Sequence, residues 1–281
     1  MLVTMEEILQ PAKEKGYGVG FFNATTLEMA RAVVETAEEL NAPVMVGTAE
    51  ALLPTTSLER SADMILPLAE EASVPVCVHF DHGFSFDWCV RALHEGFTSI
   101  MYDCSTLPYE ENVAALAEMV KICHAAGASV EGELGHVGDN TGAGKLTNPS
   151  DFYTDPKVAL DFVQRTGVDA LAIAVGNAHG DYKFKPKLDF ERIERIAGDV
   201  KIPLVLHGGS GLADDDFRIA VKKGICKVNI FTDLDKAGTN GLKKGIEAGV
   251  TGRTNLIPFE LEAMKAVVAE KLTLFGSVGQ G

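Results

Sequence analysis

The sequence predicts an α/β fold, a (β/α)8 TIM barrel formed as a single domain over residues 1–281. Short β-branched runs alternate with longer segments of helical period, which is typical of β–α units around a parallel sheet. There are eight such runs, and barrels of about 250 residues commonly form one domain. With 281 residues, of which 46% are hydrophobic, the chain is long enough for one large core.

Each predicted strand is short and is followed by a polar loop. Helices are expected between the strands, and the clearest are Thr26–Leu40 and Glu110–Ala126, whose apolar residues recur on one face. The strand candidates are Gly18–Asn23, Pro43–Gly47, Val76–Phe80, Ser99–Tyr102, Ser129–Glu133, Ala170–Val175, Pro203–Leu206 and Lys227–Ile230.

Three segments need separate predictions. A helix is expected at Asp215–Lys223, with Asp214 as its N-cap and Gly224 as its stop. Phe259–Leu272 predicts an extra C-terminal helix outside the eightfold count. The glycine-rich segment Gly135–Pro149 predicts a long mobile loop, and loops of that length are commonly functional lids or disordered.

Composition limits the possible partners. The formal net charge of -15 argues against a nucleic-acid or anionic-membrane surface, because the overall field repels phosphates. The five cysteines are odd in number and include no CxxC pair, so neither a disulfide framework nor a thiolate metal site is indicated. No apolar run approaches the roughly 20 residues that a membrane span needs. These features predict a soluble, cytoplasmic protein.

Histidines at the ends of the predicted strands indicate a metal site. His82, His179 and His207 follow three different strands, and in a barrel the C-terminal strand ends converge on the active site. A single histidine there is more often structural, but three imidazoles with an open coordination position suit zinc as a Lewis acid. His79 lies three residues before His82, so strand alternation predicts that it points elsewhere, as a packing residue or one supporting the site.

The segment HGGSG, which begins at His207, is a candidate phosphate loop. Successive backbone N–H groups can form an anion-binding nest, and the seventh and eighth strands are the usual phosphate corner of barrels. The same letters also describe an ordinary flexible turn. Their position directly after a candidate ligand favours phosphate binding. Lys183 could add positive charge, although a lone loop lysine is usually solvated.

The ordered strand-end motifs resemble a known family. The segments HFDHG, VEGELG, AVGNAHGDYKFKPKLDF, PLVLHGGSGL and KVNIFTDL are similar to class II fructose-bisphosphate and tagatose-bisphosphate aldolases, and the likeness extends to the C-terminal MKAVVAEKLTLFGSVG. The resemblance implies a metal-dependent lyase of carbohydrate metabolism, as in glycolysis. It also implies a phosphorylated sugar as substrate, dihydroxyacetone phosphate as one product, and a homodimer or homotetramer.

The resemblance also assigns roles to residues. It implies that His82, His179 and His207 bind Zn²⁺ and that Asp81 carries the proton at the carbon–carbon bond. Asp103 and Glu133 match positions that flank the metal and could hold a second divalent or monovalent cation. The implied substrate-binding residues are Asn23, Gly180, Lys183, Gly208, Gly209, Ser210, Asn229, Ile230, Phe231, Thr232, Asp233 and Arg253, with Asp233 orienting sugar hydroxyls.

Three departures from the family pattern concern the rest of the substrate. The family's loop glutamate is absent. Asp139, the only carboxylate in the loop, is the candidate base, and Glu133 is next in line, although a turn residue is the simpler interpretation of Asp139. An Asp-Pro-Arg segment is replaced by one containing Arg253, the candidate for the distal phosphate or a subunit interface. Phe231, beside Ile230, is bulky where small residues are common. The aldehyde partner therefore stays open.

Two other functions use the same residue types. A metal-dependent isomerase or epimerase of sugar phosphates also needs chelation and an acid/base carboxylate, and an inactive sugar-phosphate-binding homologue would keep the fold. Product analysis separates these classes, because only an aldolase yields two fragments. The retained Asp81 beside a complete histidine set counts against an inactive homologue.

Overall fold

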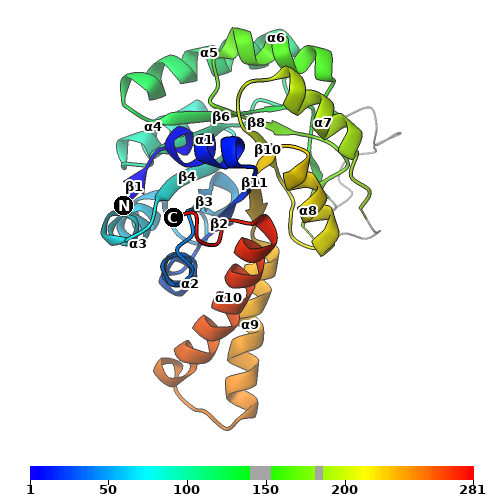
Figure 1. The fold of residues 1–281 in the computed structure, drawn as a ribbon. Coiled ribbons are helices and arrows are strands. Elements are labelled where there is room, and N and C mark those ends of the chain that lie inside the picture. The colour runs from blue at the N-terminus through cyan, green and yellow to red at the C-terminus, as the bar shows by residue number, and fades with distance from the viewer. Residues whose placement is uncertain (140–152, 181–185) are drawn as a thin grey trace.

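The computed structural model describes residues 1–139, 153–180 and 186–281. Eight parallel strands form a closed ring in the order β4-β3-β2-β11-β10-β8-β6-β5, and the β4–β5 pairing closes it (Figure 1). The predicted TIM barrel is thus confirmed. The ring strands are β2 (Val19–Asn23), β3 (Val44–Ala49), β4 (Val76–Gly83), β5 (Ser99–Tyr102), β6 (Ser129–Leu134), β8 (Ala170–Ile173), β10 (Leu204–Leu206) and β11 (Ile225–Ile230).

Three short strands lie outside the ring. The strand β1 (Leu2–Val3) pairs with the start of β4. The strands β7 (Gly138–Asp139) and β9 (Ala178–His179) pair with each other in parallel. The expected loop 135–149 is therefore interrupted by β7, and its part from residue 140 lies outside the described residues. His179 lies on β9, beyond the strand whose end was predicted to carry it.

Helices surround the ring, and α9 and α10 form an antiparallel arm that extends away from it (Figure 1). They are α1 (Met5–Lys15), α2 (Leu27–Glu39), α3 (Leu58–Glu71), α4 (Phe86–His94), α5 (Tyr109–Ala125), α6 (Pro156–Thr166), α7 (Phe190–Asp199), α8 (Asp214–Lys222), α9 (Thr232–Glu247) and α10 (Arg253–Phe275), with the 3-10 turn η1 (Glu50–Leu52) after β3.

Two helix predictions are corrected. Asp214 is not an N-cap, because α8 starts at Asp214 itself and Ala213 occupies the cap position without a side-chain hydrogen bond. The acidic first turn of α8 instead complements the helix dipole. The C-terminal helix is longer than expected, because its early turns pack on α9. A Cβ at Gly241 of α9 would lie only 2.3 Å from the carbonyl oxygen of Phe259, so glycine permits this close approach.

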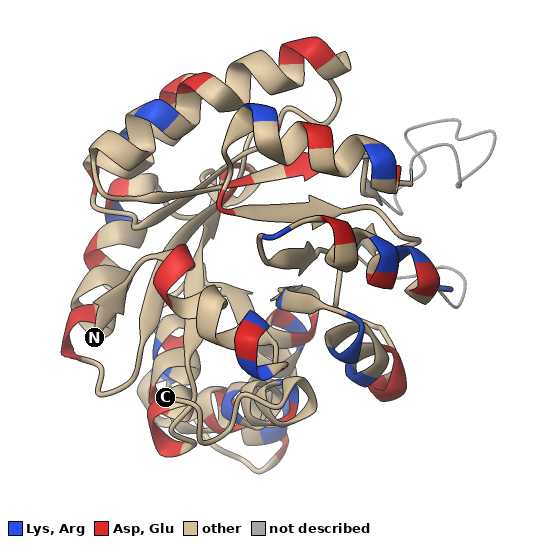
Figure 2. Cartoon of the chain, turned by 45° about the horizontal axis from the view of Figure 1, so that its top comes forward, with Lys and Arg blue, Asp and Glu red and all other residues tan. Residues whose placement is uncertain are grey.

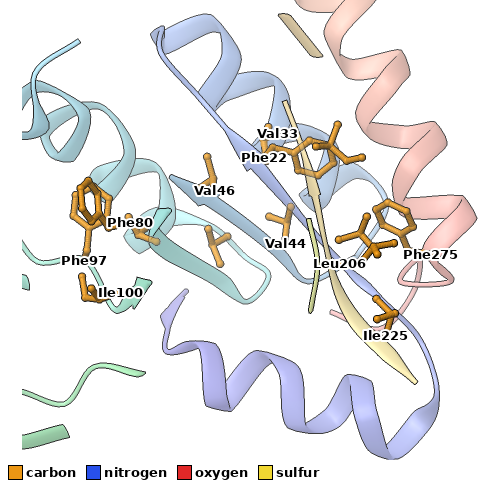
Figure 3. Close-up of a cluster of buried hydrophobic side chains, with 14 of the residues drawn as sticks. Phe22, Val33, Val44, Val46, Phe80, Phe97, Ile100, Leu206, Ile225 and Phe275 are labelled. Carbon is orange, nitrogen blue, oxygen red and sulfur yellow. The ribbon is translucent and has the colours of Figure 1, made fainter. Parts of the chain in front are cut away.

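The buried apolar residues form two clusters. The larger one lies between the strands and the surrounding helices, and Phe22, Val44, Phe80 and Phe275 belong to it (Figure 3). The smaller cluster fills the N-terminal end of the barrel interior, where α1 packs its apolar face against inward-facing strand residues such as Phe21. With that end filled, a cavity can open only toward the C-terminal strand ends.

The surface carries both signs of charge. Acidic and basic residues are interspersed over the outer helices (Figure 2). Among the described residues, no helix is both long and apolar enough to cross a membrane.

Candidate active site and metal centre

The strand β4 brings Asp81 and His82 together at the mouth of the barrel. Successive side chains of a regular strand point to opposite faces, so neighbouring residues would not share one site. His82 has a φ of 43°, and the pairing of β4 with β5 shifts register between Phe80 and Gly83. This irregularity lets Asp81 and His82 both line the same cavity. Non-glycine residues with positive φ are uncommon and often occur at functional sites.

His82 and His207 face each other across the mouth. His82 Nε2 lies 2.7 Å from His207 Nδ1. The outer nitrogen of each ring contacts a carboxylate, with His82 Nδ1 at 2.8 Å from Asp103 Oδ2 and His207 Nε2 at 2.8 Å from Glu131 Oε1. Burial lowers the pKa of His82, but the charges of Asp81 and Asp103 outweigh this and raise it to about 9. Without a metal, therefore, His82 carries two protons and donates one to His207.

The donor set fits a divalent cation. Ligand atoms of Asp81, His82 and His207, and likewise those of His82, Asp103 and Glu133, lie within 4.8 Å of one another. Glu133 Oε1 accepts a hydrogen bond from the Val137 amide, but its buried Oε2 has no hydrogen-bond partner among the described residues. Burial and the charge of Asp103 raise the pKa of Glu133 to about 8. An unpartnered buried carboxylate oxygen beside two imidazoles suits a metal ligand or its neighbour.

Asp81 is held from both sides by amides. Its Oδ2 accepts from Asn23 Nδ2 at 2.8 Å, and its Oδ1 accepts from Asn229 Nδ2 at 3.0 Å. Burial alone would raise the pKa of Asp81, but nearby positive charge, foremost that of His82 and also that of Lys227, outweighs it and lowers the pKa. The carboxylate is therefore ionised and fixed in orientation.

A cavity of about 340 Å³ opens at this mouth. Most of the predicted substrate-binding residues line it, together with an apolar side formed by β3 and η1. The lining residues are Asn23, Ala49, Ala51, Leu52, Asp81, His82, Gly180, Gly208, Ser210, Asn229, Ile230, Phe231 and Thr232.

The phosphate corner is organised differently from the predicted nest of free amides. The Gly209 amide donates to the Asn229 carbonyl, so it is not available to a ligand in this structure. Ser210 Oγ accepts from the amides of Phe231 and Asp233, which leaves its own hydroxyl proton to be donated toward the cavity. Thr232, which begins α9, also lines the cavity, so a helix N-terminus lies at this corner.

Several predicted residues lie elsewhere. Asp233 Oδ2 is 3.2 Å from Lys271 Nζ, and Asp233 does not line the cavity. Arg253, at the start of α10, is 3.6 Å from Glu28 Oε1 and is also not part of the lining.

The remaining predicted residues fall at the edge of what is described. The backbones of Asp139 and His179 pair across β7 and β9, but their side chains lie outside the described residues. Lys183 lies outside them as well. The pairing of β7 with β9 nevertheless places the backbone of Asp139, the candidate base, beside that of His179, a candidate ligand.

The sequence interpretation left two features unassigned. Glu131 and Lys227 are fully buried inside the barrel, where Lys227 Nζ lies 2.8 Å from Glu131 Oε2. Ala49 and Leu52 line the cavity. The sequence does carry a signal for the Glu131–Lys227 pair, because each is a charged residue at an inward position of an otherwise apolar strand. Nothing in the sequence indicated that Ala49 and Leu52 line the cavity, because small and apolar residues are common near loops.

Comparison with known proteins identifies the family. The family model described as "Fructose-bisphosphate aldolase class-II" matches residues 3–280. The chain belongs to this family. It is 40% identical over 285 residues to a "Probable fructose-bisphosphate aldolase" of Bacillus subtilis, with 99% of each chain covered. It is also similar to the crystal structure of the YdjI aldolase from Escherichia coli K12, with a TM-score of 0.90, 36% identity, and coverage of 100% of this chain and 99% of that one.

Membership in the family gives the class of reaction. This class II aldolase is a carbon–carbon lyase that acts on a phosphorylated sugar, as predicted. The isomerase and the inactive homologue considered from the sequence are therefore not favoured.

Proposed function

We propose that this class II aldolase reversibly cleaves a ketose phosphorylated at C1, such as a fructose- or tagatose-1,6-bisphosphate-like sugar, to dihydroxyacetone phosphate and an aldehyde. The observation that carries the proposal is the ionised Asp81, fixed beside the facing nitrogens of His82 and His207 in the cavity at the barrel mouth.

We propose that His82, His179 and His207 hold a catalytic zinc ion, and that Asp103 and Glu133 could take part in holding a second cation. A divalent ion bound there supplies a Lewis acid for the negative charge that cleavage leaves on the triose phosphate fragment. To bind the ion, the nitrogen of each imidazole that faces it must carry no proton. Asp103 keeps the outer nitrogen of His82 protonated and thereby directs Nε2 inward.

Asp81 moves the proton at the bond that breaks. During cleavage the C4 hydroxyl gives its proton to the Asp81 carboxylate, the C3–C4 bond breaks, and its electron pair stays on C3 of the triose phosphate. During condensation Asp81 returns the proton to the oxygen of the aldehyde. The lowered pKa keeps Asp81 ready to accept, and the amides of Asn23 and Asn229 hold it in place.

Proton exchange at C3 of the triose phosphate needs another base, and we assign it to Asp139. Its backbone lies opposite that of His179, so the segment that carries it adjoins the proposed metal centre. Glu133 is the next candidate, because a pKa near 8 suits a group that gains and loses protons at neutral pH. Exchange of the C3 proton with solvent, measured for Asp139→Asn and Glu133→Gln, distinguishes the two.

The aldehyde half of the substrate is assigned to the apolar side of the cavity. Ala49, Ala51 and Leu52 form this side, and the described lining contains no lysine or arginine. Glu50, which lies between Ala49 and Ala51 in the sequence, adds a negative charge, and its carboxylate accepts hydrogen bonds from the amides of Phe84 and Ser85. A second phosphate bound here would therefore lose its hydration, and no lysine or arginine of the described lining would compensate its charge. We expect a ketose 1-phosphate to be a better substrate than the corresponding 1,6-bisphosphate.

The proposed function is tested with a panel of phosphorylated ketoses and zinc-loaded enzyme. Release of triose phosphate is followed by a coupled assay, and chelated enzyme and Asp81→Asn serve as controls. We expect two fragments, with activity lost on chelation and restored by zinc or cobalt. Formation of an isomeric sugar phosphate without fragments would refute the aldolase assignment of this site. Full activity in protein shown by elemental analysis to be metal-free would refute the metal.

We also propose that the protein is a homodimer or homotetramer, and that the α9–α10 arm forms the interface. Ile246 at the end of α9 is 60% exposed, although it is a large apolar residue. Light scattering coupled to size-exclusion chromatography is the measurement, and a monomer at micromolar concentration would contradict the proposal.

A further inference from the structure

A chain of buried polar side chains crosses the barrel interior beneath the proposed metal centre. Lys227 on β11, Glu131 on β6 and His79 on β4 are each fully buried. Lys227 Nζ lies 2.8 Å from Glu131 Oε2 and 3.4 Å from His79 Nε2. Its ammonium group also lies 4.7 Å from the centre of the Phe21 ring. A buried ion pair is frequently no more stabilising than apolar residues of the same volume. Stability alone therefore does not explain why charges are placed here.

The hydrogen-bonding capacity of each group sets the direction of the chain. Lys227 can only donate, so both His79 Nε2 and Glu131 Oε2 must accept from it. His79 then carries its proton on Nδ1 and donates to Ser99 Oγ at 2.7 Å. An ionised carboxylate can only accept, so Glu131 Oε1 must receive its hydrogen bond from His207 Nε2 at 2.8 Å.

This direction determines which nitrogen His207 presents to the site. With the proton held on Nε2, Nδ1 is the unprotonated nitrogen, and it faces His82 Nε2. The opposite tautomer would leave Glu131 Oε1 facing a lone pair and would place a proton where a ligand nitrogen is needed. A carboxylate that bonds to the far nitrogen of a ligating imidazole fixes its tautomer and ring orientation.

We propose that Glu131 and Lys227 are positioning residues, which hold His207 in the tautomer and orientation that present Nδ1 to the metal. This inference rests on the proposed function, because it takes His207 as a ligand. Lys227 neutralises and orients Glu131, and Glu131 acts on His207. Neither residue lines the substrate cavity.

The experiment separates positioning from mere stability. The double variant Glu131→Leu/Lys227→Met replaces the pair with apolar side chains and leaves no unpaired charge. We expect it to fold and to be more stable than Lys227→Met, although His207 Nε2 and His79 Nε2 lose their hydrogen-bond partners. The single variant Lys227→Met leaves a buried uncompensated carboxylate and should be much less stable. Zinc affinity, measured by competition with a chromophoric chelator, should fall about 10- to 100-fold in the double variant. If the pair were only structural, the double variant would bind zinc as tightly as the wild type.

The second readout does not depend on a metal. Long-range ¹H–¹⁵N spectra of the metal-free protein report the tautomer of each histidine. They are recorded in a His82→Ala background, which removes the second partner of His207 Nδ1. We expect His207 to be protonated at Nε2 when Glu131 and Lys227 are present but mixed when the double change is added. An unchanged tautomer would overturn the proposal. Glu260→Gln is the control, because Glu260 is a buried carboxylate in α10. It should leave zinc affinity within about twofold of the wild type, and an equal loss there would mean that the effect is not specific.

A third variant distinguishes failure of the proposed metal centre from failure of the positioning role of Glu131 and Lys227. His207→Ala should abolish tight zinc binding if His207 is a ligand. Unchanged zinc affinity in His207→Ala would contradict the proposed metal centre, and with it the assignment of Glu131 and Lys227. Loss of affinity in His207→Ala together with an unaffected double variant would contradict only the positioning role.

Discussion

Replacing Asp81 with asparagine should abolish catalysis but leave the fold intact. Both partners of Asp81 are amide donors, whereas an asparagine side chain has one acceptor and one donor group. The new NH2 group would therefore face the NH2 group of Asn23 or Asn229. The Oδ1 atoms of Asn23 and Asn229 are buried and have no hydrogen-bond partner among the described residues. Rotation of one of these amides would present its oxygen to the new NH2 group and restore the pair.

The expected loss of stability follows from this exchange. A hydrogen bond to a charged acceptor contributes about 1.5–3 kcal/mol and a neutral one about 1 kcal/mol, so converting two bonds costs about 1–4 kcal/mol. For a chain of this size, that lowers the melting temperature by roughly 2–3 °C per kcal/mol. Asp81→Leu is the matched comparison, because it leaves both Asn23 and Asn229 without an acceptor. At about 1–3 kcal/mol for each orphaned donor, it should cost about 2–6 kcal/mol.

The assay combines thermal unfolding with cleavage and metal content in the same preparations. We expect Asp81→Asn to retain zinc and triose phosphate binding and to lose at least about a hundredfold in kcat, the usual contribution of a positioned acid/base group. Turnover within a few-fold of the wild type would show that another group carries the proton. Equal destabilisation of the asparagine and leucine variants would refute the amide rotation.

Three further predictions concern the metal, the cavity and the loop after β10. Because the pKa of His82 is raised to about 9 in the metal-free protein, zinc must displace a proton below that pH. Zinc affinity should therefore rise roughly tenfold per pH unit up to about pH 9, and an affinity independent of pH would contradict the assignment. Leu52→Arg should raise kcat/KM for fructose 1,6-bisphosphate relative to fructose 1-phosphate at least about tenfold, equivalent to about 1.4 kcal/mol, and an unchanged ratio would place the aldehyde elsewhere. Gly208→Ala should lower the melting temperature and the zinc affinity, because its Cβ would lie 2.1 Å from the Ala178 carbonyl oxygen at a φ of 64°. Gly249→Ala is its control, with a φ of 82° but no atom within 4 Å, and an equal effect of the two changes would show that backbone strain alone is responsible.

The strand pattern was sufficient to predict the barrel, but not how its N-terminal end is filled. Each predicted run overlaps one ring strand, because short apolar runs separated by helical segments leave few other arrangements. The apolar residues Met5, Ile8, Leu9 and Ala12 have helical spacing and show that α1 has one buried face. They do not show what covers that face. Packing of α1 inside the barrel end depends on side chains from strands far away in the sequence.

Local irregularity limits the prediction of the site more than composition does. Alternation does not separate His79 from His82 as predicted, because both side chains point into the barrel; His79 lies deeper, where it contacts Ser99 and Lys227. The same rule would have separated Asp81 from His82, yet both line the cavity because His82 adopts a positive φ. No residue type at this position requires that conformation, so only the tertiary structure reveals it.

Depth along the barrel axis explains why residues two apart on one strand have different roles. Alternation puts Glu131 and Glu133 on the same inward face of β6, and the sequence alone does not distinguish them. Inward side chains of a barrel stack in layers, and two residues along a strand is one layer. In the deeper layer Glu131 meets Lys227 and is saturated by hydrogen bonds from Lys227 and His207. One layer nearer the mouth, Glu133 Oε2 has no described partner and lies 3.9 Å from His207 Nδ1. One carboxylate is therefore committed to holding an imidazole, while the other stays available to a cation or a proton.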